Sequence, residues 1–105
     1  MKGDGMGDGV STSTDDGQDK KPLIEYPTVY TFKVMGKQAP DFVEYVRGLF
    51  RLLMGTEISP DSIREQPSSK GTYVSLSVSV YLLSEEHRRA IYARLRQEQR
   101  VVYYL

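Results

Sequence analysis

The sequence contains no cysteine among its 105 residues. Disulfide bonds and thiolate chemistry are therefore excluded, and the absence is consistent with a reducing compartment. No apolar run approaches the roughly 20 residues that a helix needs to cross a bilayer, and the N-terminal residues lack the apolar segment of a secretory signal peptide. We therefore expect a soluble cytoplasmic protein that does not enter a membrane.

The chain also has no net charge, so its bulk charge predicts no general attraction to polyanions. The charges are nevertheless unevenly distributed. Residues 1–22 carry five Asp against three Lys, whereas residues 85–105 carry five Arg against three Glu. Because these arginines alternate with glutamates, we interpret them as a solvated helix face in preference to a site for an anionic partner.

Large apolar residues are scarce in the first part of the chain, which holds five of the nine glycines. Such a segment cannot bury enough surface to offset the entropy of ordering it. We predict a disordered tail over residues 1–22 and a single domain over residues 23–105. The acidic residues of the tail do not predict a metal site, because Met6 stands where a calcium loop requires an oxygen ligand.

The strongest structural signal is the strict alternation over Thr72–Leu83, which predicts a half-buried strand. Its polar side carries serines and its other side is aliphatic. The aliphatic residues are Val74, Leu76, Val78, Val80 and Leu82.

Shorter patterns predict the other elements. Strands are expected at Thr28–Met35, at Ser62–Gln66 and at Val101–Leu105, from β-branched and aromatic residues and from flanking turn residues. A core-facing helix is predicted from Pro40 to a stop at Gly55, and a second helix begins at the N-cap Ser84. The apolar stripe of the first helix comprises Phe42, Val43, Val46, Leu49, Phe50 and Leu53.

This order of strands and helices predicts an α+β, ferredoxin-like β-α-β-β-α-β sandwich. A four-stranded antiparallel sheet would carry both helices on one face. The first and third strands would be central, and the short, charged second strand would lie at an edge.

Two segments resemble the signatures of a bacterial protein family. Tyr26–Gly36 is similar to the opening strand of the YbeD-like family, and Pro67–Tyr73 is similar to the turn before its long strand. The resemblance covers about residues 25–105. It implies an ACT-like form of the ferredoxin fold in a small cytosolic protein whose biochemical role is not established, and it supplies no catalytic residues.

The residues do not favour an enzyme. The single histidine, His87, lies on the inward side of the second predicted helix, where a half-buried packing role is the more common one, and no nucleophile is paired with it. No carboxylates show the spacing of a metal site or of an acid–base pair. We therefore predict no catalytic residues, no metal and no cofactor.

Nucleic-acid binding is also disfavoured, although RNA-recognition domains share this topology. Their sheets stack bases on aromatic residues of the central strands. Here Thr72 and Val74 occupy the aromatic positions, and the exposed row consists of Ser75, Ser77 and Ser79.

The ACT-like resemblance implies a small effector near the loop after the first strand, commonly where two domains pair. Gly36 is expected in that loop, with Lys33 and Lys37 beside it to attract an anion. A turn glycine alone would also account for Gly36. A second polar cluster, able to present hydroxyls, an ammonium group and backbone N–H groups to an anion, comprises Ser68, Ser69, Lys70 and Gly71.

The sequence therefore predicts a non-enzymatic, ACT-like regulatory module that binds a small anionic effector or a partner protein, as a homodimer. The alternative is a protein-only adaptor that uses its edge strands or its exposed sheet face. Val102 and Tyr104 are expected to face outward beside that surface. The predicted interface residues are Thr31, Ser75, Ser77, Ser79 and Tyr104.

Overall fold

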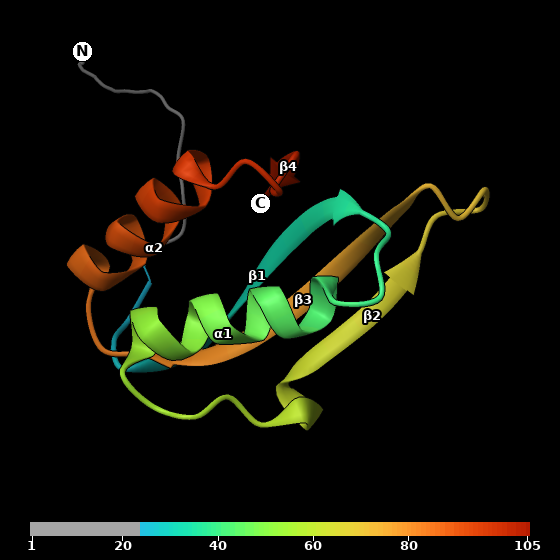
Figure 1. Cartoon of the computed structure of the whole chain (residues 1–105). Coiled ribbons are helices and arrows are strands. Elements are labelled where there is room, and N and C mark those ends of the chain that lie inside the picture. The colour runs from blue at the N-terminus through green and yellow to red at the C-terminus, as the bar shows by residue number, and fades with distance from the viewer. Residues whose placement is uncertain (1–23) are drawn as a thin grey trace, which may run out of the picture.

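The computed structural model describes residues 24–105. The predicted tail, residues 1–22, lies outside the described residues. The described chain forms one four-stranded antiparallel sheet with the strand order β2-β3-β1-β4. Both helices lie on the same face of this sheet, and the other face is uncovered (Figure 1). The predicted ferredoxin-like architecture is confirmed.

The elements follow the predicted order, with small shifts at their ends. Helix α1 begins two residues after the predicted Pro40, and Gly55 ends it in a left-handed conformation with φ of 71°. Ser84 caps α2 by accepting a hydrogen bond from the backbone N–H of His87 at 3.1 Å. The elements are β1 Thr28–Lys37, α1 Phe42–Met54, the short 3-10 helix η2 Pro60–Ser62, β2 Ile63–Pro67, β3 Tyr73–Leu82, α2 Glu85–Gln97 and β4 Tyr103–Tyr104.

The core lies between the two helices and the inner faces of the central strands β1 and β3. All five aliphatic residues predicted from the alternation of β3 are buried. The ring of Phe32 on β1 meets Phe50 of α1 at 5.5 Å and Tyr92 of α2 at 4.9 Å between centroids. Because edge-to-face contacts of this kind add to the burial of apolar area, this aromatic group fixes both helices on the sheet.

The first strand is longer than predicted, and Gly36 lies inside it. It pairs with Val74 of β3 and is buried, so it is not a loop residue. A Cβ added here would lie 2.5 Å from the carbonyl oxygen of Arg100 and would collide with the ring of Phe42. The predicted loop role of Gly36 is therefore wrong: only glycine allows the strand, α1 and the chain before β4 to approach this closely.

The side chain of Tyr104 on the last strand faces the opposite side of the sheet from the predicted one. Tyr104 pairs with the buried Val34, and its ring lies 5.8 Å from that of Tyr92 on the helix side of the sheet. Tyr103 and Leu105 are exposed, at 55% and 58%, and Val102, which precedes the strand, is exposed as predicted. Because neighbouring strand residues face opposite sides, a shift of one residue in register exchanges the two faces. The prediction that Tyr104 faces outward is wrong.

Candidate functional site

A cavity of about 550 Å³ opens where the connection after β1 meets the connection between α2 and β4. We call it the loop pocket. Its volume falls within the range of ordinary small-ligand sites. The lining residues are Lys37, Gln38, Ala39, Gln99, Arg100 and Val102.

The side chain of Arg100 holds the two connections together through its contacts with Asp41 and Tyr45. Its guanidinium donates hydrogen bonds to both carboxylate oxygens of Asp41, at 2.8 and 3.1 Å. It also lies over the ring of Tyr45, 4.6 Å from the centroid. The hydrogen bonds from Arg100 lower the pKa of Asp41, so the pair stays ionised at neutral pH. A cation is thus fixed at the wall of the loop pocket.

A second set of polar contacts secures the end of α2 behind this wall. Glu98 accepts hydrogen bonds from the Tyr45 hydroxyl and from Arg94 Nε, the latter at 2.8 Å. The bond from Tyr45, and then that from Arg94, lowers the pKa of Glu98. Partial burial, together with the neighbouring Glu98, raises the pKa of Tyr45 to about 12. Side chains of both helices therefore support the wall from behind.

The chemistry available in the loop pocket is recognition of an anion. Lys37 is exposed and makes no ion pair with any residue between 24 and 105. Its ammonium group can donate to a carboxylate or a phosphate, and such charge-assisted bonds are the strong ones. Gln38 and Gln99 add amide groups that both donate and accept hydrogen bonds.

The other predicted ligand residues are not gathered in this pocket. Lys33 points to the uncovered face of the sheet, because it alternates with the buried Phe32 and Val34. The cluster from Ser68 to Gly71 forms the turn between β2 and β3 (Figure 1).

The β2–β3 turn explains the polar residues that the sequence assigned to an anion site. The hydroxyl of Ser68 accepts a hydrogen bond from the backbone N–H of Tyr73 at 3.2 Å, and its own N–H donates to the Tyr73 carbonyl at 2.8 Å. Gly71 adopts φ of 71° and donates to the Ser68 carbonyl. Ser68 and Gly71 are thus turn residues, whereas Ser69 and Lys70 remain exposed.

The uncovered face of the sheet, which we call the open face, holds most of the predicted interface. Thr31 and Ser79 are hydrogen-bonded across the central strands at 2.9 Å, and Ser75 and Ser77 lie beside them. The open face consists of Val29, Thr31, Lys33, Met35 and Lys37 from β1, Arg64 and Gln66 from β2, Tyr73, Ser75, Ser77, Ser79 and Tyr81 from β3, and Tyr103 and Leu105 at the C-terminus.

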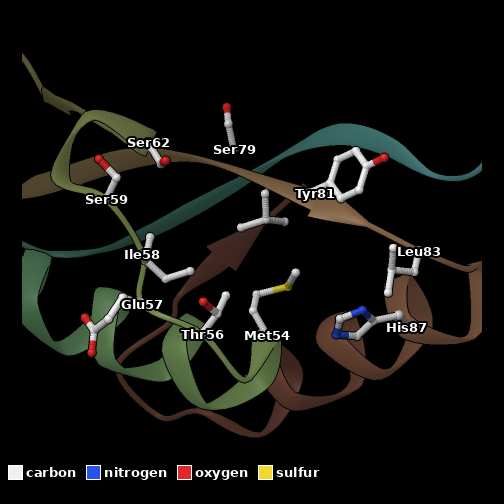
Figure 2. A pocket seen from close by; sticks show the side chains of 11 residues that line it. Met54, Thr56, Glu57, Ile58, Ser59, Ser62, Ser79, Tyr81, Leu83 and His87 are labelled. Atoms are coloured by element: carbon white, nitrogen blue, oxygen red, sulfur yellow. The ribbon is translucent and has the colours of Figure 1, made fainter.

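A second cavity, of about 420 Å³, lies beside the end of β3 where β2 no longer pairs with it. In Figure 2, Met54, Ile58 and His87 lie on the helix side of β3, whereas Ser79 points the other way. His87 is half-buried, as predicted, and donates from Nε2 to the Leu53 carbonyl oxygen at 2.9 Å. This apolar pocket was not predicted; the only signal for it is that β3 is twice as long as its partner β2.

Two further features are absent from residues 24–105. No group of three or more metal-ligating side chains occurs among these residues. None of their helices has the length and apolar character that crossing a membrane requires.

Comparison with known proteins places the chain among bacterial relatives. A UPF0250 protein of Hahella chejuensis is 37% identical over 86 residues, which cover 82% of this chain and 93% of the relative. A UPF0250 protein of Leptothrix cholodnii is 34% identical over 76 residues, which cover 72% of this chain and 82% of the relative. The predicted resemblance to the YbeD-like bacterial family is confirmed.

A solved structure supports the fold. The solution structure of protein HP0495 from H. pylori superimposes with a TM-score of 0.65 and covers 86% of this chain and 98% of that chain, at 21% sequence identity. Residues 21–105 match a family that is described only as a protein of unknown function. The chain therefore belongs to the DUF493 family of proteins of unknown function.

Proposed function

We propose that the chain is a cytoplasmic, non-enzymatic, ACT-like regulatory module that binds a small anionic effector in the loop pocket. The observation that carries the proposal is the position of two cationic side chains, Lys37 and Arg100, on the wall of one cavity directly after β1. This is the region where the ACT-like resemblance implies an effector.

The two cations have different roles in this proposal. Lys37 contributes the direct bond, because it has no carboxylate partner among residues 24–105. Arg100 is already bound to Asp41 at two positions, so it contributes mainly its fixed position and its remaining N–H donor capacity. A monocarboxylate or a single phosphate fits this arrangement better than a highly charged ligand, because Asp41 offsets part of the positive charge.

The test is a thermal-shift screen of the full chain against amino acids, nucleotides and carboxylate metabolites. An effector at about 100 times its dissociation constant adds about 2.7 kcal/mol, and each kcal/mol raises Tm by roughly 4–8 °C in a domain of this size. We expect a saturable shift that Lys37→Gln abolishes.

Lys33→Gln is the matched control, because Lys33 lies on the same strand and is also exposed, but it does not line the loop pocket. Gly36→Val is unsuitable as a test, because the side chain would collide with Phe42. No shift across the panel, or an equal loss with both lysine variants, contradicts effector binding at this pocket.

A second candidate function is a protein-only adaptor, which the uncovered sheet face favours. Light scattering alongside the screen measures whether the chain pairs with itself, as the ACT-like resemblance implies. The adaptor predicts that Ser77→Glu weakens binding to a partner protein while the effector response is unchanged.

A further inference from the structure

Positive charges on the two sides of this protein have different partners. All the arginines on the helices except Arg96 form ion pairs with neighbouring carboxylates among residues 24–105, for example Arg88 with Glu85 and Arg94 with Glu98. On the open face, Lys33 and Arg64 make no ion pair with any residue from 24 to 105. No Asp or Glu side chain of the described strands lies on this face.

The strand register fixes how these cations are arranged. Lys33 of β1 pairs with Ser77 of β3, and Ser77 pairs with Arg64 of β2, so the three form one row. Strands lie about 4.8 Å apart, which separates the two cations by about 10 Å across a serine. The positive potential therefore centres on a flat area of short side chains.

Exposed apolar residues gather around this charged centre. Val29 and Tyr81 pair across β1 and β3 at one end of the face, and they are 66% and 57% exposed. Tyr103 lies at the opposite edge of the face, beside Met35. Tyrosine, methionine and arginine are the residue types that are enriched in protein–protein interfaces.

This arrangement fits a protein better than a nucleic acid. A sheet that binds single-stranded RNA needs aromatic residues in the middle of its central strands, where bases stack. Here Ser75 and Ser77 occupy the middle of β3, and the tyrosines stand at the rim. Aliphatic residues such as Val29 offer no stacking surface to a base.

The charge on the open face also disfavours a second copy of the domain as the partner. Two open faces packed against each other would bring the Lys33 and Arg64 cations of both copies together. Like charges that face each other across an interface weaken association. A complementary partner must carry the opposite charge.

We propose that the open face is a docking surface for an acidic protein partner, whose carboxylates lie opposite Lys33 and Arg64 and whose apolar residues contact Tyr81 and Tyr103. This proposal rests on the second candidate function, the protein-only adaptor, and specifies its partner. It does not require a ligand in the loop pocket. Failure of one proposal therefore leaves the other intact.

The test is an NMR titration of the isotope-labelled full chain with a glutamate-rich copolymer of glutamate and tyrosine. We expect shifts in the amide signals of the open face, centred on Ser77, with binding that weakens as ionic strength rises. Lys33→Glu combined with Arg64→Glu should weaken binding by about tenfold or more, because two attractive contacts become repulsive. Arg96→Glu, an exposed reversal on α2, is the control and should leave affinity unchanged.

Three results overturn the proposal. The first is the absence of binding, and the second is a set of shifts that lies outside the open face. The third is tighter binding of an oligothymidylate of matched charge to the same face, which would assign the surface to nucleic acid. Because the variants leave Lys37 and Arg100 unchanged, the effector screen remains an independent measurement.

Discussion

Gly36 shows how one residue can hold three segments of the chain together. The sequence places it at the end of a strand, where a turn would explain it equally well. In the structure it is the point where β1, the ring of Phe42 and the carbonyl of Arg100 come together. The glycine is required for packing, and the loop pocket beside it depends on the same close approach.

We expect Gly36→Ala to lower the free energy of unfolding by about 1–3 kcal/mol, the usual cost of overpacking a core. Urea unfolding measures the change. Gly48→Ala is the matched control, because nothing lies within 4 Å of an added Cβ there. It should raise stability by about 0.5–1 kcal/mol through helix propensity. Equal effects of the two substitutions would contradict the packing role of Gly36.

Glu85 provides a residue-scale prediction on pH. Arg88 donates two hydrogen bonds to its carboxylate and Tyr26 donates a third, at 2.7 Å. The bonds from Arg88, then that from Tyr26, lower the pKa of Glu85 from 4.5 to about 2. A lowered folded pKa means that this stabilisation is fully present above pH 4.5 and is lost as pH falls toward 2.

In wild type, Tm should therefore fall over this acidic range by more than in Glu85→Gln, which has no carboxylate to titrate. Thermal unfolding followed by circular dichroism at several pH values measures the difference. Glu86→Gln is the control: Glu86 is the exposed neighbour and makes no ion pair within residues 24–105. A pH profile of Glu85→Gln that matches wild type would show that the network around Glu85 does not stabilise the fold.

At the scale of elements, α2 depends on its ends because its apolar face is narrow. Only Ile91 and Leu95 of its thirteen residues are fully buried. A helix with so little burial relies on capping and on its first turn, where Glu85 and Glu86 suit the helix dipole. Loss of the N-cap should therefore destabilise the whole of α2.

We expect Ser84→Ala to cost about 1 kcal/mol, because the His87 N–H loses its acceptor. Equilibrium unfolding in urea measures the loss. Ser59→Ala is the comparison, since Ser59 accepts a similar bond from the Asp61 N–H at 3.2 Å but caps only the three-residue η2. Its effect should be clearly smaller; an equal or larger effect would mean that capping of α2 contributes little.

The edge strand β4 shows where prediction from the sequence of a single element failed. The position of β4 follows from its β-branched and aromatic residues, but the choice of inward face between Tyr103 and Tyr104 does not. The contact between Tyr104 and Tyr92 settles it, together with the bond from the Val102 N–H to the Met35 carbonyl at 2.8 Å. A two-residue strand carries too short a pattern to specify its own register.

At the scale of the whole molecule, the buried core is confined to one stretch of the described chain. Among residues 24–105, its fourteen residues all lie between Phe32 and Leu95. We therefore expect residues 23–105 alone to unfold with the same urea midpoint and m-value as the full chain, within about 0.5 kcal/mol in free energy. A loss of more than about 1 kcal/mol on truncation would contradict the predicted domain boundary.

The two faces of the molecule also differ in a way that no single element shows. On one side, the helices bring arginines and carboxylates together within the same or neighbouring turns. On the other side, β1 and β2 both pair with β3 and so bring together cations that are far apart in the chain. The net charge of zero conceals this separation, which is why the composition gave no indication of a positively charged face.

The sequence by itself determined the order of the elements. It also determined which faces of β1 and β3 are buried and which apolar stripe of α1 faces the core, because these depend on periodicity within one segment. It also assigned Ser84 correctly as an N-cap, since this contact lies within its own helix. Only the tertiary structure decided which distant segments meet. It placed Lys37 and Arg100 on the wall of one pocket, turned Tyr104 inward and made Gly36 a packing residue. Each of these outcomes depends on contacts between distant segments, and no pattern within a single segment encodes such contacts.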